Sequence, residues 1–313
     1  MTHYILDCDP GHDDAVALLM AGRYLDLVGV TTVFGNSTVE NTTRNALAIL
    51  DAAGLGHIPV AAGADKPLAG KTHSAEAVHG KSGLDGANFP ASQNHAIAMS
   101  APEFIAEQAE RYGDLVVIAV APETNVALAL QQYPGIKNRI SGISIMGGST
   151  SFGNATAAAE FNVFADPEAA AVVFASGIPI TMSGLNVTAR FGLDRDQLNR
   201  LSNNGTLVAH ELAGALGFYL GRQDVMYERQ FAPLHDVCAV LPFSHPGLIE
   251  YEPMHVVVEC EGRFTRGMTL CDLRGIVAGE GVEMSQPPNA RVAVKVDEDV
   301  IKTLILDTLC EFP

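Results

Sequence analysis

The strongest chemical signal in the sequence is an acidic cluster near the start of the chain. Four carboxylates fall within eight residues, in the run Asp7-Cys8-Asp9-Pro10-Gly11-His12-Asp13-Asp14. Pro10 and Gly11 favour a tight turn that would fold Asp9 back towards Asp13 and Asp14. So many like charges are costly together unless a cation neutralises them. Hard oxygen ligands select Ca²⁺ or Mg²⁺ over zinc or copper, so the run predicts a divalent-metal site.

Two other interpretations of this run stay open on the residues alone. One is a solvated acidic turn, because acidic residues are common in a first helical turn. The other is the nucleophile loop of haloacid-dehalogenase-type phosphatases, which Asp7-x-Asp9 resembles, although that class has Thr or Val where Gly11 stands. An EF-hand loop beginning at Asp7 is excluded, because its twelfth position is Leu18 instead of Glu.

Three further polar clusters stand where a site would be expected. They are the run 121–125 with Glu123 and Thr124, the pair Gly147-Gly148 followed by Asn154, Glu160 and Asn162, and the pair His235-Asp236. Each has a purely structural interpretation when it is taken alone. Thr124 could cap a helix, Glu160 could be a surface acid, and His235 could be a satisfied core histidine.

Alternating strand and helix patterns must position these clusters. The first 180 residues predict strands at 4–6, 27–34, 58–61, 115–120, 143–146 and 178–182, and helices at 14–21, 38–53, 102–112, 124–132 and 167–176. The strands are continuous apolar runs, as expected when helices cover both faces of a sheet. The predicted fold is therefore α/β, with a single open, mostly parallel sheet and helices on both faces. Ligands bind beyond the carboxyl ends of such strands, which is where the acidic run stands.

The rest of the chain departs from this alternation of strands and helices. Residues 62–100 predict a long polar loop, which in a compact domain is usually a binding loop or lid. Mainly helical structure is expected from Asp194 to about Tyr227, β structure at 255–259 and 291–295, and a final helix after the N-cap Asp297. No Pro/Ser linker and no internal repeat divides the chain. We expect one domain over 1–313, with C-terminal helical and β elaborations.

Composition excludes several classes of partner. The 36 acidic and 19 basic residues give a formal net charge of −17, which argues against a nucleic-acid polymer and against an anionic membrane surface. No apolar run approaches the ~18 residues that span a bilayer, and no signal-peptide pattern is visible. The five cysteines are an odd number and widely spaced. A reduced, cytoplasmic protein is therefore expected.

Taken together, the polar clusters resemble those of the calcium-dependent ribonucleoside hydrolases, the inosine/uridine-preferring family. The resemblance rests on seven motifs that occur in order over residues 7–240. They are D-C-D-P-G-H-D-D (7–14), F-G-N (34–36), H-G-K-S-G-L-D-G (79–86), P-E-T-N (122–125), M-G-G (146–148), A-E-F-N-V-F-A-D-P-E-A-A (159–170) and H-D-V-C-A-V (235–240). Total length also matches the family.

The resemblance implies a calcium site and a general base. Asp9, Asp14 and Asp236 would ligate Ca²⁺ through their carboxylates, and the backbone carbonyl of Thr124 would be a fourth protein ligand. Asp9 would also hold the attacking water and take its proton. Glu123 is a departure, since the family usually has Leu at that position, and it adds a carboxylate near the metal loop.

The resemblance also implies a ribose pocket. Asp13 and Asn162 would bind the 2′ and 3′ hydroxyls, and Asn154 and Glu160 would bind the 5′ hydroxyl. Two more residues would line this pocket, Asn36 and Met146. A nucleoside that lacks the 2′ hydroxyl would therefore be a poor substrate.

On the base side, His79 and His235 would face the nucleobase, with His235 as the candidate acid for the leaving group. Gln223 and Tyr227 lie four residues apart on one face of a predicted helix. They resemble the pair that approaches the base in pyrimidine-preferring members, which indicates uridine and cytidine over inosine. Tyr219, one turn earlier, departs from that subgroup, which tends to have Thr there.

The implied reaction is hydrolysis of the N-glycosidic bond of a small ribonucleoside to free base and ribose, with inversion at the anomeric carbon. The implied assembly is a homodimer or a homotetramer. Two alternatives stay open: a magnesium-dependent phosphatase of the haloacid-dehalogenase type, and a non-catalytic ribose- or calcium-binding module.

Overall fold

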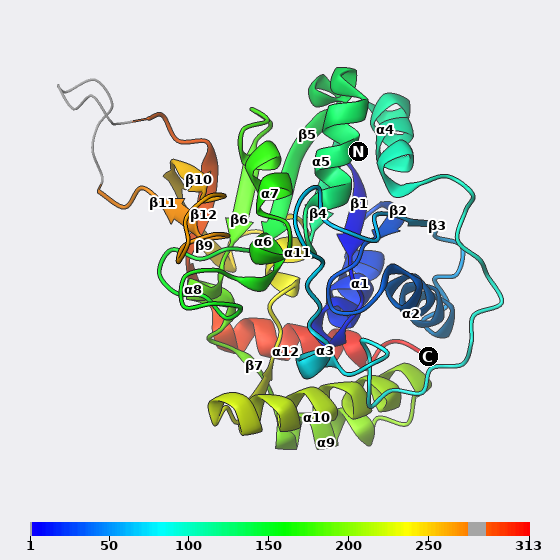
Figure 1. Cartoon of the computed structure of the whole chain (residues 1–313). Coiled ribbons are helices and arrows are strands. Elements are labelled where there is room, and N and C mark those ends of the chain that lie inside the picture. The colour runs from blue at the N-terminus through cyan, green and yellow to red at the C-terminus, as the bar shows by residue number, and fades with distance from the viewer. Residues whose placement is uncertain (1, 275–285) are drawn as a thin grey trace.

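The computed structural model describes residues 2–274 and 286–313, and its centre is an eight-stranded sheet (Figure 1). In spatial order the strands are β3 (Val60–Ala62), β2 (Leu27–Thr32), β1 (His3–Cys8), β4 (Leu115–Ala119), β5 (Ile140–Met146), β6 (Ile180–Ser183), β12 (Ala290–Val296) and β9 (Ile249–Met254). Every neighbouring pair is parallel except β12 with β9. The predicted open, mostly parallel sheet is confirmed.

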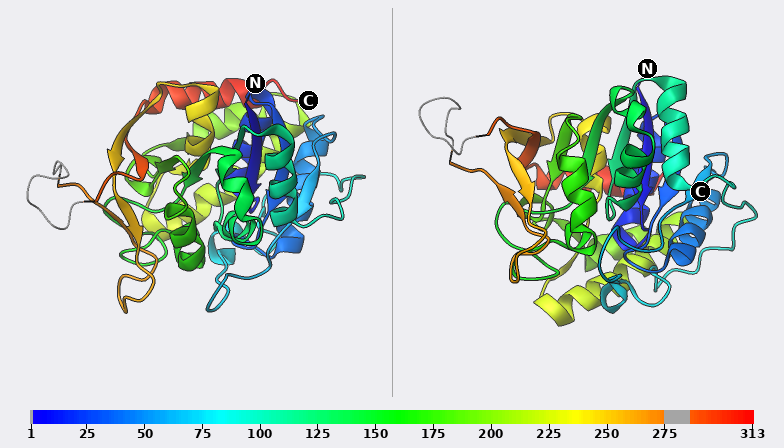
Figure 2. Two further views of the ribbon diagram at one scale, coloured as in Figure 1. Left: turned by 90° about the horizontal axis from the view of Figure 1, so that it is seen from above. Right: turned by 45° about the horizontal axis from the view of Figure 1, so that its top comes forward.

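Helices cover both faces of this sheet, as the continuous apolar strands predicted (Figure 2). One face packs against α1 (His12–Tyr24), α11 (Val237–Ser244) and α12 (Glu298–Leu309). The other packs against α4 (Ala101–Tyr112), α5 (Thr124–Gln132) and α7 (Pro167–Phe174). All five residues of β4 are buried, because it lies in the middle of the sheet between these two layers.

The remaining elements lie at several places around the sheet, and α2 (Val39–Ala52) packs beside α1 on the same face. The other helices are α3 (Glu76–His79), α6 (Phe161–Ala165), α8 (Leu185–Thr188), α9 (Arg195–Ser202), α10 (Leu207–Tyr227) and the 3-10 helix η1 (Pro134–Asn138). Two small antiparallel pairs are β7 (Gly192–Asp194) with β8 (Phe231–Pro233), and β10 (Val256–Val258) with β11 (Thr269–Cys271). Within the described ranges, no helix is long and apolar enough to cross a membrane.

Some boundaries differ from the sequence-based expectations. α5 has the predicted bounds, and the Asp297 side chain accepts a hydrogen bond from the Val300 N–H, so it caps α12 as predicted. The β structure predicted at 255–259 forms β10, which pairs with β11 outside the central sheet. Strand β9 was not predicted. Among the described strands of the central sheet, its neighbour is the antiparallel β12. Its first and last residues, Ile249 and Met254, are buried and most of the residues between them are exposed, so it lacks the continuous apolar run of the other strands.

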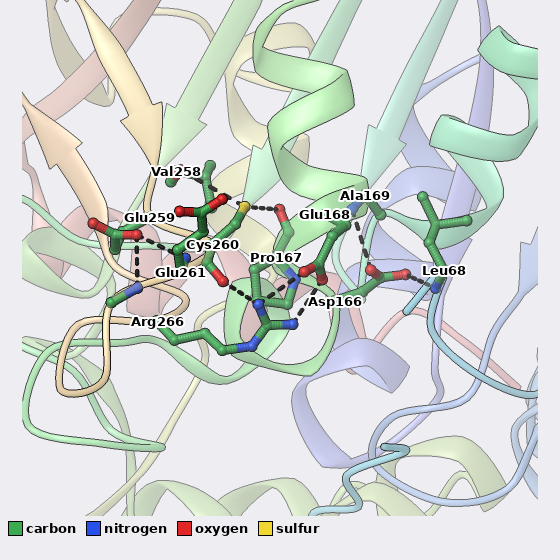
Figure 3. A network of polar contacts seen from close by, with 11 residues as sticks. Leu68, Asp166, Pro167, Glu168, Ala169, Val258, Glu259, Cys260, Glu261 and Arg266 are labelled. Carbon is green, nitrogen blue, oxygen red and sulfur yellow. Dashed lines mark hydrogen bonds and ion pairs between the residues drawn. The ribbon is translucent and has the colours of Figure 1, made fainter. Parts of the chain in front are cut away.

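A polar network fixes the segment between α6 and α7, which leads into the site (Figure 3). Arg266, in the loop between β10 and β11, donates two hydrogen bonds of 2.8 Å to the Glu168 carboxylate and one to the Cys260 carbonyl. Asp166 caps α7 by accepting from the Ala169 N–H, and its other oxygen accepts from the Leu68 N–H at 2.9 Å. The start of α7 is therefore connected both to the loop between β10 and β11 and to the long loop after β3.

Candidate active site

The sequence-predicted clusters meet at the carboxyl ends of adjacent parallel strands. Asp9 follows β1, Asn36 follows β2, Glu123 follows β4 and Gly147 follows β5. Parallel pairing of β1 with β2 and β4 brings these ends to one edge of the sheet. His235 and Asp236, from the start of α11, complete the site from across the molecule, because the His235 N–H donates to Asp13 Oδ2 at 3.2 Å.

Asp14 accepts three hydrogen bonds that hold the acidic cluster together. Its Oδ1 accepts from the Asp9 N–H at 3.1 Å, and its Oδ2 accepts from the Gly11 N–H at 3.1 Å and from Asn36 Nδ2 at 2.8 Å. The chain bends at Gly11, the residue before α1, which allows this return. Gly11 also admits a close approach, since an added Cβ would lie 2.5 Å from His79 Nδ1. The turn therefore fixes the carboxylate before any ligand binds.

Three carboxylates approach one another closely at this point. Ligand oxygens of Asp13, Asp14 and Asp236 all lie within 4.8 Å of one another. Asp14 and Asp236, which were predicted to converge, do so. Asp13, predicted for the ribose hydroxyls, belongs to the same group, and Asp9 adjoins it by its interaction with Asp14.

The electrostatics of this cluster favour a bound cation. Burial raises the pKa of Asp13 to about 8, and burial with neighbouring carboxylates raises the pKa of Asp9 and Asp236 well above the usual range. Asp9 Oδ1 is buried without a hydrogen bond, while its Oδ2 accepts from the Asn36 N–H at 2.6 Å. In the part of the chain that the structure describes, no Lys or Arg forms an ion pair with these acids. Buried, hard and unpaired oxygen donors fit a divalent metal ion.

Thr124 and Glu123 lie beside this cluster, at the start of α5. The Thr124 hydroxyl donates to Asp166 Oδ2 at 2.6 Å, so its side chain is part of the polar network at the start of α7. Only the backbone carbonyl of Thr124 is then left to bind a ligand. Thr124 is the first residue of α5, and the structural alternative that its side chain caps this helix is not what is found. Glu123 is fully buried, and neither of its carboxylate oxygens has a hydrogen-bond partner in the described chain.

A cavity of about 460 Å³ opens above the acidic cluster. All nine predicted substrate-binding residues line it, while Asp9, Asp14 and Thr124 lie outside the lining set. The predicted residues in its wall are Asp13, Asn36, His79, Met146, Asn154, Glu160, Asn162, Gln223, Tyr227, His235 and Asp236.

The residues predicted for the ribose are held by the backbone. Glu160 caps α6 through the Asn162 N–H and also accepts from the Gly148 N–H, both at 2.9 Å. Burial raises the pKa of Glu160 to about 7, although these hydrogen bonds by themselves lower it. Asn162 Nδ2 donates to the carbonyls of Val120 and Met146, which leaves its Oδ1 as an acceptor towards the cavity. Asn154 accepts from the Phe161 N–H, which leaves its amide N–H₂ to donate.

The base side of the cavity contains one residue that sequence reasoning did not single out, Arg229, and one that it named, Tyr219. Arg229 lines it, donates to Gln223 Oε1 at 3.2 Å, and lies over the Tyr227 ring at 5.8 Å from its centroid. Tyr219 is 3% exposed and also lines the cavity, so it is part of the site and not only a packing residue of α10. No sequence signal pointed to Arg229, because its role depends on how the segment after α10 folds back.

Two histidines face the cavity. His235 Nδ1 lies 2.9 Å from the Thr188 hydroxyl, and burial lowers the pKa of His235 to about 3. His79 Nδ1 lies 2.9 Å from Nδ1 of His12, a residue that sequence reasoning did not single out by itself. Burial lowers the pKa of His79 and, to about 4, that of His12. Burial therefore favours the neutral form of both cavity histidines.

Comparison with known proteins gives consistent matches over nearly the whole chain. The family model described as inosine-uridine preferring nucleoside hydrolase matches residues 4–303. The pyrimidine-specific ribonucleoside hydrolase RihA of Escherichia coli O9:H4 (strain HS) is 39% identical over 312 residues, covering 97% of each chain. Among solved structures, a purine-preferring ribonucleoside hydrolase from Gardnerella vaginalis is 32% identical with a TM-score of 0.90, covering 98% of each chain. The plant nucleoside hydrolase PpNRh1 is 31% identical with a TM-score of 0.91, covering 99% of each chain.

Proposed function

Since the chain belongs to the inosine-uridine preferring nucleoside hydrolase family, we propose that it hydrolyses the N-glycosidic bond of ribonucleosides to free base and ribose. One observation carries this proposal. The acids Asp13, Asp14 and Asp236 converge beside a cavity whose wall holds the polar residues expected for a ribose, among them Asn162 and Glu160.

We propose Ca²⁺ as the cofactor, held by Asp14, Asp236 and Asp9 with the Thr124 carbonyl. The buried carboxylate oxygens fit a hard cation, and Asp9 Oδ1 is free to face one. When bound, the ion would supply Lewis-acid chemistry that makes a water molecule easier to deprotonate and orients vicinal hydroxyls. Asp13 lies close enough to the same oxygens to act either with the ion or with the sugar.

The chain's own residues would supply the rest of the catalysis. Asp9 is held rigidly by the Asn36 N–H, so its other oxygen can take a proton from the attacking water. Positive charge develops on the sugar in an oxocarbenium-like transition state. The neighbouring carboxylates of Asp13 and Asp14 stabilise that charge without reorganising, because backbone and side-chain donors already fix them.

Departure of the base needs a proton or a strong hydrogen bond, and His235 is placed to give it. When the Thr188 hydroxyl donates to His235 Nδ1, the ring proton lies on Nε2. A neutral imidazole N–H of this kind can donate to the leaving base without the ring first being charged. This agrees with the lowered pKa of His235 in its buried position.

Pyrimidine nucleosides are the proposed substrates. Arg229 donates to Gln223 Oε1, so the Gln223 amide N–H₂ is directed to other partners and can donate to a pyrimidine carbonyl. The relative RihA is described as pyrimidine-specific, whereas the Gardnerella protein is described as purine-preferring. Cytoplasmic location and assembly into a homodimer or homotetramer stay predictions.

The deciding experiment incubates the calcium-loaded protein with uridine, cytidine, inosine, 2′-deoxyuridine and uridine monophosphate, and assays reducing sugar, free base and phosphate. We expect free base and ribose from the first three, and little from the last two. Phosphate release without free base would favour a phosphatase, and binding without any product would favour a binding module. Inosine processed tenfold better than uridine, about 1.4 kcal/mol of transition-state binding, would overturn the pyrimidine preference alone.

A further inference from the structure

His12 is a buried imidazole to which the proposed chemistry gives no role. It begins α1, is fully buried, and is not among the residues that line the cavity. Its ring stacks on Phe218 and Tyr219, with centroids 5.7 Å and 5.2 Å away. It also stacks on His79, at 5.0 Å. Because His79 does line the cavity, His12 lies directly behind a residue that faces the substrate.

Two short contacts determine where the ring protons lie. His12 Nε2 is 2.9 Å from the backbone carbonyl oxygen of Asp85, and His12 Nδ1 is 2.9 Å from Nδ1 of His79. A carbonyl oxygen only accepts, so the single proton of a neutral His12 lies on Nε2. His12 Nδ1 then has a lone pair, and His79 must donate to it from Nδ1. The Nε2 of His79 is left without a proton.

The other arrangements of two neutral rings fail. A proton on His12 Nδ1 would place a bare Nε2 against the Asp85 carbonyl oxygen, and two acceptors at 2.9 Å repel each other. The His12 backbone N–H also approaches His79 Nδ1, but at 3.4 Å. Satisfying that longer contact would need a lone pair on His79 Nδ1, and hence a doubly protonated His12 in a fully buried position.

Hydrogen bonds hold the loop that supplies the Asp85 carbonyl oxygen. The Asp85 side chain accepts from the N–H groups of Lys81 and Ser82 and from the Ser82 hydroxyl. Gly80 allows this closed turn, because its φ is 79° and an added Cβ would lie 2.2 Å from the Asp85 carboxylate. The motif over 79–86 thus holds both His79 and the carbonyl that orients His12.

We propose that His12 is a positioning residue that fixes the tautomer of His79, so that His79 presents an unprotonated Nε2 to the cavity. There it accepts a hydrogen bond from an N–H group of the nucleobase. This inference rests on the proposed function for the identity of the ligand. Within the described residues His79 Nε2 has no hydrogen-bond partner, which leaves it for the base. In this tautomer His79 cannot protonate the leaving group, so that task falls to His235.

The tautomer can be measured directly on the whole, calcium-loaded protein. Long-range ¹H–¹⁵N correlation spectra of ¹⁵N-histidine-labelled protein distinguish protonated from bare ring nitrogens. We expect His79 to be protonated at Nδ1 and bare at Nε2, and His12 to have the opposite pattern. The His79 resonances are assigned from a His79→Gln variant. Protonated Nε2 on wild-type His79, or a doubly protonated His12, overturns the proposal whatever the enzyme's activity.

Two substitutions of His12 then test the effect on recognition. His12→Phe keeps an aromatic ring in the stack but removes both nitrogens, so His79 should shift towards the Nε2–H tautomer. His12→Asn is the matched control, because its side-chain oxygen can still accept from His79 Nδ1. Uridine has a single base N–H, at N3, so 3-methyluridine is the matched substrate that lacks it.

The expected result is a substrate-selective loss. His12→Phe should lower kcat/KM for uridine about tenfold, the worth of one neutral hydrogen bond, and change kcat/KM for 3-methyluridine less than about threefold. His12→Asn should keep the wild-type tautomer and lie within about threefold of wild type on uridine. Equal losses on both substrates, or an unchanged His79 tautomer in His12→Phe, would make His12 a packing residue. A wild-type protein inactive on every nucleoside would refute the proposed function while leaving the tautomer measurement valid.

Discussion

At the scale of single residues, Asp14 connects local sequence to chemistry. Its two oxygens accept from Asp9, Gly11 and Asn36, so one side chain closes the turn, joins β1 to the loop after β2, and faces Asp13 and Asp236. Hydrogen bonds to a buried carboxylate are charge-assisted and stronger than neutral ones. This one position therefore determines the geometry of the whole acidic cluster.

Removing this carboxylate should abolish activity and spare the fold. We expect Asp14→Ala to lower kcat/KM for uridine by at least about 10²–10³-fold, the range for losing one preorganised electrostatic group, and to weaken calcium binding in titration calorimetry. Circular dichroism should be unchanged. Asp51→Asn, which alters a carboxylate that is hydrogen-bonded to Ser92 and Asn94 and does not line the cavity, is the control. Near-normal turnover of Asp14→Ala would refute the metal assignment.

The role of His235 can be separated from simple packing by the choice of leaving group. We expect His235→Ala to cost about 10²–10⁴ in kcat on uridine, the span of acid–base catalysis. On p-nitrophenyl riboside, whose leaving group needs no proton, the cost should be far smaller. The same loss on both substrates would reassign His235 to positioning, for which its hydrogen bonds to Thr188 and Asp13 would be sufficient reason.

At this scale the sequence was informative where function depends on chemistry local in the chain. The run from Asp7 to Asp14 predicted that the chain folds back and that its acids converge. His12 and Arg229 were missed as site residues because their roles arise from contacts with residues distant in sequence or across a turn, such as His79 and Gln223. A single sequence contains no periodic or spacing signal for such contacts.

At the scale of elements, α5 begins with an unusual buried acid. Glu123 is the residue before its first turn, yet its side chain makes no capping hydrogen bond. Burial raises the pKa of Glu123 well above its usual range, and the charges of nearby acids, Glu160 first, raise it further. Burying a polar group without partners costs about 1–3 kcal/mol. Glu123 is thus a local weakness in the central layer.

Replacing this acid by an apolar residue should stabilise the protein. We expect Glu123→Leu to raise the free energy of unfolding by about 1–3 kcal/mol, measured by urea denaturation with the m-value unchanged. Glu123→Gln is the control, because it keeps a polar group in the same place and should change stability little. A Glu123→Leu protein less stable than wild type would mean that the carboxyl group has a partner, such as a bound ion or water.

Element prediction succeeded where periodicity is strong. The buried strands β1, β4 and β5 and the helix α5 follow from continuous apolar runs and a 3.6-residue repeat. Strand β9 could not be predicted in this way, because Glu250, Glu252 and Pro253 interrupt any apolar pattern. Its pairing with β12 is non-local, and only tertiary structure decides it.

At the scale of the whole molecule, the protein is strongly acidic and concentrates several acids in its interior. Burial raises the pKa of Asp13 to about 8 and the pKa values of Asp7 and Glu160 to about 7. A folded-state pKa above the unfolded value means that the folded chain binds more protons between the two values. Without a cation, stability is therefore lost as pH rises from about 4 to about 8.

The single domain over 1–313 stays a prediction.

Calcium should offset this loss, and more strongly at higher pH. We expect the Tm in calcium to exceed the Tm in EDTA, with a larger difference at about pH 8 than at about pH 6, because an ion can replace the protons on the buried acids. Differential scanning calorimetry at both pH values measures it. Repeating the scans in high salt separates site binding from general screening of the net charge of −17. A difference that shrinks as pH rises would contradict this account.

The position of β12 in the sheet has a consequence for how the protein is synthesised. This strand, Ala290–Val296, is synthesised after both of its neighbours, yet it pairs with β6 on one side and β9 on the other. Until then the nascent chain keeps β6 with an open edge, and an open edge invites pairing with another chain. A ribosome that stalls shortly before this strand would release a polypeptide that contains every motif residue but an incomplete sheet. Chaperone dependence during translation is therefore expected to last at least until β12 has emerged from the ribosome.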